Sequence, residues 1–119
     1  VPFILPGPEH GLRALVEEIA RQQAVRLGVV VELDAFGEMQ QLVARGLGFT
    51  VMSSAAFNYG LRPDLSAALI LRPTVSRIVN LASASGRMPS RAVNEVAQRL
   101  RQVVQMRAAE EAWLANSIS

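Results

Sequence analysis

The run Val29-Val30-Val31-Glu32-Leu33-Asp34 contains three consecutive β-branched residues. A continuous apolar run of this kind is typical of a buried parallel strand. Upstream, apolar residues recur over residues 12–20 at the spacing of one helical face, with Arg13, Glu17, Glu18 and Arg21 expected on the opposite face. Glu17 and Arg21 have the spacing of an ion pair along that helix.

The same alternation continues on both sides of this core stretch. Residues 3–5 form a short apolar run between prolines, which predicts a buried strand. Asp34 is expected to be the N-cap of a second helix that ends at Gly46 and Gly48, and residues 49–52 are expected to form a third strand. Strand, helix, strand, helix, strand predicts an α/β fold with a mainly parallel sheet.

The second half of the chain has a weaker pattern. Residues 53–64 read as a connecting segment with turn signals, and residues 67–71 and 78–82 are expected to be strands. Ser90 is the expected N-cap of a long C-terminal helix that continues to about Trp113.

Composition excludes several classes of protein. Half of the 119 residues are hydrophobic and 18% are charged, which excludes disorder. All basic residues are arginines, the net charge is only +2, and the arginines are scattered, so we do not expect these residues to bind DNA. There is no cysteine, no apolar run as long as a membrane span and no signal peptide, so a cytoplasmic location without membrane association is expected. The apolar opening without an initiator Met indicates a piece of a longer protein.

Catalytic and metal chemistry are excluded by missing partners. His10 is the single histidine and there is no cysteine, so we expect no metal site. Lysine and a G-x-S-x-G motif are absent, and Gly46-Leu47-Gly48 lacks the third glycine of a dinucleotide-binding loop. Glu32 and Asp34 could form a catalytic pair, but a strand-edge charge and a helix cap are the preferred interpretation. We therefore expect no catalytic residues, no cofactor and no enzyme.

Two turns follow predicted parallel strands and are the candidate binding site. Gly7-Pro8-Glu9-His10-Gly11 precedes the first helix, and Asp34-Ala35-Phe36 precedes the second. Both should lie at the carboxyl edge of the sheet, where open α/β sheets bind ligands. Helix N-termini there offer N–H groups to anions, although ordinary loop and cap chemistry is the alternative for each turn.

Several ordered segments resemble LysR-type transcriptional regulators. They are similar to the second regulatory subdomain of that family, close to the nitrogen-assimilation-control-like branch: Pro2-Phe3-Ile4-Leu5-Pro6, Gly11-Leu12-Arg13, Val30-Val31-Glu32-Leu33-Asp34 and Leu42-Val43-Ala44-Arg45-Gly46-Leu47-Gly48-Phe49-Thr50-Val51-Met52. Leu71-Arg72-Pro73, Ser76-Arg77 and Pro89-Ser90-Arg91-Ala92-Val93 resemble the segment that crosses back to the first subdomain. The resemblance extends to Val104, and Ser53-Ser54 stand where the family usually has a proline and a basic residue.

The resemblance implies a Rossmann-like, type 2 periplasmic-binding-protein-like subdomain with a long C-terminal helix. Residues 1–82 would be effector-binding subdomain II, and residues 83–119 the crossover and the helix that packs on a missing subdomain I. A small, anionic effector would bind in the cleft between subdomains, DNA would bind only through a missing N-terminal domain, and the protein would be a homo-oligomer. The effector-binding residues on this chain would be Gly7, Pro8, His10, Asp34, Ala35, Phe36 and Ser53.

Two other interpretations stay open. The apolar face of the last helix is also typical of a module that self-associates. A stand-alone α/β solute-binding protein or small enzyme is the third, and the lack of a signal peptide and of a catalytic constellation argues against it.

Overall fold

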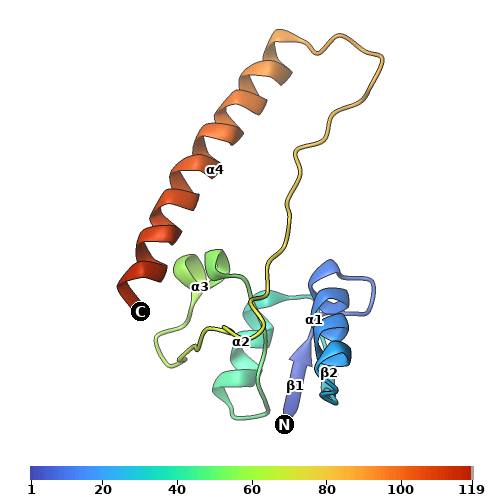
Figure 1. The fold of residues 1–119 in the computed structure, drawn as a ribbon, viewed down its shortest axis with the longest axis vertical. Coiled ribbons are helices and arrows are strands. Elements are labelled where there is room, and N and C mark those ends of the chain that lie inside the picture. The colour runs from blue at the N-terminus through green and yellow to red at the C-terminus, as the bar shows by residue number, and fades with distance from the viewer. Residues whose placement is uncertain (119) are drawn as a thin grey trace. The chain divides into compact units, whose positions relative to one another are not determined.

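The computed structural model describes the backbone of residues 1–118 and the side chains of residues 1–57 and 60–110. The chain divides into two compact units, Val1–Val75 and Ser76–Ser119. Figure 1 shows the elements, which in the first unit are β1 (Pro2–Leu5), α1 (Gly11–Gln22), β2 (Gly28–Glu32), α2 (Phe36–Ala44) and α3 (Ser54–Gly60), and in the second α4 (Arg91–Ile118).

The sheet is parallel, as predicted, and β1 lies at its centre. β1 pairs with β2 from Pro2 opposite Gly28 to Leu5 opposite Glu32, with an irregularity between Phe3 and Ile4. On its other side, β1 meets Phe49: the Ile4 amide donates to the Phe49 carbonyl at 2.8 Å, and the Phe49 amide donates to the Pro2 carbonyl at 2.9 Å. The expected third strand over residues 49–52 is therefore a single parallel bridge.

The core of the first unit gathers around β1. Ile4 and Leu5 are fully buried, and Met39 of α2 and Ala20 of α1 are buried with them. α2 packs against β1. Fully burying a large aliphatic side chain contributes about 1.5–3 kcal/mol. The buried side chains of Ile4 and Leu5 therefore help to hold α2 on the sheet.

The structure corrects three predictions about the middle of the chain. Residues 67–71 and 78–82 form no strands, and the one pairing near them is an isolated antiparallel bridge between Leu71 and Thr74. Ile78 and Val79 are 86% and 80% exposed, so these apolar runs lack the neighbouring strand that a strand needs. Conversely, the expected connecting segment contains α3, whose N-cap Ser53 accepts a hydrogen bond from the Ala56 amide at 3.3 Å.

The predicted C-terminal helix is confirmed. The Ser90 hydroxyl accepts a hydrogen bond from the Val93 amide at 3.3 Å, and α4 then runs from Arg91 to Ile118, past the expected end at Trp113. Within the described part of the chain, none of the helices has both the length and the apolar character that a membrane span requires.

Candidate functional site

The loop after β1 and the segment after β2 border an open hollow of about 450 Å³, lined by Gly7, Pro8, Glu9, His10 and Asp34. We call it the hollow. Both segments follow parallel strands, so the hollow lies at the carboxyl edge of the sheet. Gly7, Pro8, His10 and Asp34 were predicted as site residues, and the structure brings these four together. Glu9 is a lining residue that the prediction omitted.

His10 is the N-cap of α1. Its Nδ1 accepts a hydrogen bond from the Leu12 amide at 3.2 Å. In the neutral ring, an accepting Nδ1 leaves the hydrogen on Nε2. The side chain therefore caps the helix with one nitrogen and offers an N–H donor with the other.

Asp34 does not cap α2, contrary to the prediction. The N-cap is Ala35, which has no side chain to accept a hydrogen bond. The Asp34 carboxylate instead accepts the Gly7 amide at 3.0 Å. Asp34 lies one residue before the N-cap position of α2. Its hydrogen bond to the Gly7 amide links the turn after β2 to the turn after β1.

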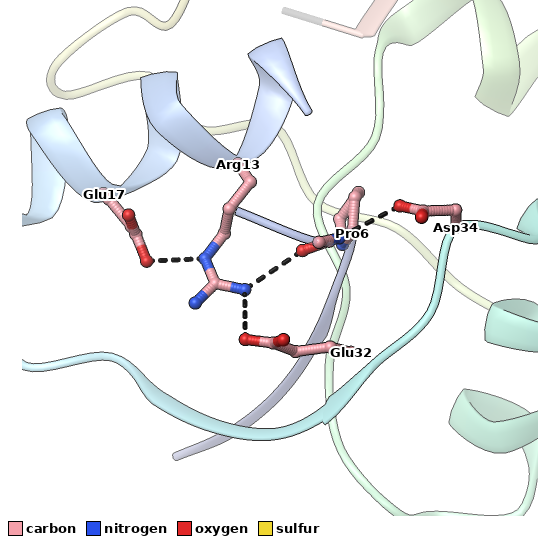
Figure 2. Close-up of polar contacts among 6 residues, drawn as sticks. Pro6, Arg13, Glu17, Glu32 and Asp34 are labelled. Carbon is pink, nitrogen blue, oxygen red and sulfur yellow. Dashed lines mark hydrogen bonds and ion pairs between the residues drawn. The ribbon is translucent and has the colours of Figure 1, made fainter. Parts of the chain in front are cut away.

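Arg13 forms a buried cluster behind this loop, which Figure 2 shows. Its guanidinium donates to the Glu17 carboxylate at 2.6 Å, to Glu32 at 3.1 Å and to the Pro6 carbonyl at 3.0 Å. The Arg13 side chain is 9% exposed, whereas Glu17 and Glu32 are about half exposed. The hydrogen bond that Arg13 donates to Glu17, together with the one to Glu32, raises the pKa of Arg13 above its ordinary value against the opposing effect of burial, so the guanidinium stays charged.

This cluster corrects the predicted faces of the first helix. Arg13 was expected on the solvent face, yet it is buried, and it lies seven residues before buried Ala20, hence on the same helical face. That spacing was the available signal. The predicted Glu17–Arg21 pair is also replaced, because Glu17 pairs with Arg13 and Arg21 pairs with Glu18 at 2.7 Å.

The remaining predicted site residues lie outside the lining of the hollow. Ala35 is the N-cap of α2, and Phe36 is the first residue of that helix, half-buried and facing Gly60. Ser53 caps α3. Each of these three has an ordinary structural function in the first unit, and their part in ligand binding stays a prediction.

The hollow has an open, largely apolar lining that carries a few polar groups. Glu9 and Asp34 supply carboxylate acceptors, and His10 supplies the Nε2 donor. The amides of Gly7 and Leu12 already have acceptors within the protein. Among the described residues, no group of three or more histidine, cysteine or acidic side chains could hold a metal ion.

Comparison with known proteins identifies a family. The family model described as LysR substrate binding domain matches residues 1–105. Comparisons with curated proteins and with solved structures return no match. The family implies a periplasmic-binding-protein-like α/β fold that takes a small-molecule effector, and the parallel β1–β2 pair and the helix α4 agree with it. A match over residues 1–105 of 119 shows that the chain belongs to the LysR substrate binding domain family.

Proposed function

We propose that this chain senses a small effector for a LysR-type DNA-binding transcriptional regulator, and that the effector binds in the hollow. One observation carries the proposal: four residues chosen for their place at the carboxyl edge of the sheet, Gly7, Pro8, His10 and Asp34, line a single hollow. Membership of the family supports small-molecule binding by this domain.

The finer features of the proposal follow the family resemblance. Residues 1–82 act as the second effector-binding subdomain, close to the nitrogen-assimilation-control-like branch, and residues 83–119 cross back to a first subdomain. The effector biases the relative pose of the two subdomains, and DNA is bound by a separate N-terminal domain. The protein works in the cytoplasm as a homo-oligomer and catalyses no reaction.

The charge of the effector can be argued in two directions. The N-terminus of α1 favours an anion through the helix dipole. The carboxylates of Glu9 and Asp34 instead favour a ligand that carries N–H or O–H donors or a positive charge. We retain the anionic effector as the proposal and include both classes of probe in its test.

The test measures the melting temperature of the chain with propionate and sulfate as anionic probes and methylammonium as a cationic probe. A ligand that binds only the folded state, present at 100 times its dissociation constant, adds about 2.7 kcal/mol of stability, which raises the melting temperature of a domain of this size by about ten degrees. We expect a rise with at least one anion. This rise should change in Asp34→Ala, which removes a negative charge from the lining of the hollow, and stay at the parent's value in the control Asp64→Ala, which alters an exposed carboxylate outside the hollow. A rise with methylammonium alone would overturn the anionic class, and no rise with any probe would overturn the proposed site.

The regulator identity has a separate test. The residues encoded immediately before Val1 are expected to contain the rest of an effector domain and, further upstream, a helix-turn-helix. An upstream sequence without a helix-turn-helix would contradict the proposal.

A second candidate function is self-association through α4. Its apolar residues are unusually exposed, with Val96 at 58% and Val104 at 64%, and Leu100 and Val103 lie beside them. Such a face favours pairing with a second copy. Sedimentation should show a dimer that Leu100→Glu abolishes, whereas a monomer at high concentration would contradict this candidate.

A further inference from the structure

Arg13 and Asp34 hold the same peptide unit from opposite sides. The Pro6 carbonyl and the Gly7 amide belong to one peptide group, because residue 6 supplies its oxygen and residue 7 its nitrogen. Arg13 donates to that oxygen at 3.0 Å, and Asp34 accepts from that nitrogen at 3.0 Å (Figure 2). This planar group begins the loop that forms one wall of the hollow.

We propose that Arg13 is a positioning residue for the hollow: it fixes the orientation of the Pro6–Gly7 peptide from the buried side, while Asp34 fixes it from the ligand side. The consequence for ligand binding, a loop kept in the orientation that an effector would meet, rests on the proposed function. Its structural content, the restraint of Gly7, stands independently of any ligand.

The cluster around Arg13 is built for orientation. The guanidinium is planar with several N–H donors in fixed directions, and here it uses Nε for Glu17 and one terminal nitrogen for both Glu32 and Pro6. Glu17 lies in α1, Glu32 is the last residue of β2, and Pro6 directly follows β1. The direction of the Arg13 N–H that donates to the Pro6 carbonyl is therefore set by contacts with three separate segments.

The same cluster connects the two turns of the site. Glu32 is the last residue of β2, and Asp34 follows two residues later. They contact the same loop in different ways: Glu32 accepts from Arg13, which donates to the Pro6 carbonyl, and Asp34 accepts directly from the Gly7 amide. A ligand that draws the Asp34 carboxylate away would remove the hydrogen bond to the Gly7 amide. The Pro6–Gly7 peptide would then be held by Arg13 alone.

The experiment measures hydrogen exchange at the Gly7 amide in the 119-residue chain, with Ile4 and Leu5 amides as reporters of global opening. In Arg13→Lys the charge remains, but one ammonium group cannot reproduce the fork that spans the three partners. Because a hydrogen bond to a charged group contributes on the order of 1.5 kcal/mol, we expect Gly7 exchange to rise on the order of tenfold relative to Ile4 and Leu5. Arg21→Lys, in the same helix and with its own carboxylate partner, is the control and should leave Gly7 unchanged.

Three further variants keep the outcome decisive. Asp34→Asn preserves an acceptor for Gly7 and should exchange nearly as slowly as the parent, whereas Asp34→Ala should exchange faster. If Arg13→Lys fails to fold, Glu32→Gln, which weakens one support of the guanidinium, must still accelerate Gly7 more than Arg21→Lys does. Unchanged Gly7 exchange in the folded Arg13 or Glu32 variant overturns the positioning function.

A second experiment measures the effect of the probes on the melting temperature. Whichever of propionate, sulfate or methylammonium raises the melting temperature of the parent should do so less in Arg13→Lys than in Arg21→Lys. An equal rise in both variants overturns the positioning function and leaves the proposed site intact. Should none of these probes bind the parent, the proposed function fails, and the Gly7 exchange rates still decide the positioning function.

Discussion

Gly48 lies closely against the backbone of β1, next to the bridge between Phe3 and Phe49. A Cβ at this position would lie 2.6 Å from the Pro2 carbonyl oxygen, a backbone atom that also accepts the Phe49 amide. Gly48→Ala should therefore lower the free energy of unfolding by about 1–3 kcal/mol. Gly37→Ala is the matched control, since nothing lies within 4 Å of its Cβ and alanine favours the helix by up to about 1 kcal/mol. Urea unfolding of both variants checks this, and equal effects would contradict the close approach.

Gln40 is a second residue with a specific structural function. Its side chain is almost fully buried, its Nε2 donates to the Gly60 carbonyl at 2.7 Å, and its Oε1 accepts the Arg62 amide at 3.0 Å. Gln40→Ala leaves both backbone groups without their partner and should cost about 1–3 kcal/mol. The exposed neighbour Gln41→Ala should change the unfolding free energy by less than about 0.5 kcal/mol. Similar losses at the two positions would show that the buried amide bonds contribute little.

At this scale, part of the lining of the hollow could be predicted from the sequence, whereas its part in ligand binding stays a prediction. Gly7, Pro8, His10 and Asp34 could be predicted because turns after parallel strands meet at one edge of the sheet. The spacing between Arg13 and Ala20 indicates only the buried helical face of Arg13; its acceptors could not be predicted, because a charge on a helix is ordinarily solvated and the acceptors come from three separate segments. The sequence predicts Asp34 as the cap of the nearest helix, yet its carboxylate oxygen accepts a hydrogen bond from a residue 27 positions away.

At the scale of one element, α1 contains an exposed ion pair with a measurable titration. The hydrogen bond from Arg21 to Glu18, followed by that from Gln22, holds the pKa of the Glu18 carboxyl below its ordinary value. A depressed folded-state pKa stabilises the folded state above the unfolded-state pKa, and that contribution is lost as the pH falls through the lowered value. In Arg21→Gln the Glu18 pKa should move back toward its ordinary value. Carbon-detected NMR titration of the carboxyl groups checks this, and an unchanged Glu18 pKa would contradict the pairing.

The helices were more predictable than the strands for a physical reason. The apolar spacing over residues 12–20 and the cap at Ser90 are local properties, and α1 and α4 form where they predict. Residues 78–82 have β-branched and apolar side chains but no paired neighbour, and a strand depends on that neighbour. These strands are absent because no neighbouring strand pairs with residues 78–82, and the local sequence pattern carries no information about pairing.

At the scale of the whole molecule, the exposed stretch over residues 65–90 has neither helix nor strand. Trypsin cleaves after basic residues in extended, accessible segments, so the exposed bonds after Arg77 and Arg87 should be cut before those after Arg13 and Arg21 in α1. The bond after Arg72 should resist because Pro73 follows it. Mass spectrometry of early fragments checks the order, and a first cut within α1 would contradict the division into two compact units.

The central claim is that a small effector binds in the hollow, and amide NMR of the chain during titration with propionate, sulfate and methylammonium tests it most directly. We predict saturable shifts of the Gly7, Glu9, His10 and Asp34 amides, which surround the hollow. The amides of residues 24–27, which line a second open hollow on the first unit, should stay in place. Shifts confined to residues 24–27, or no saturable shift with any probe, would contradict the claim.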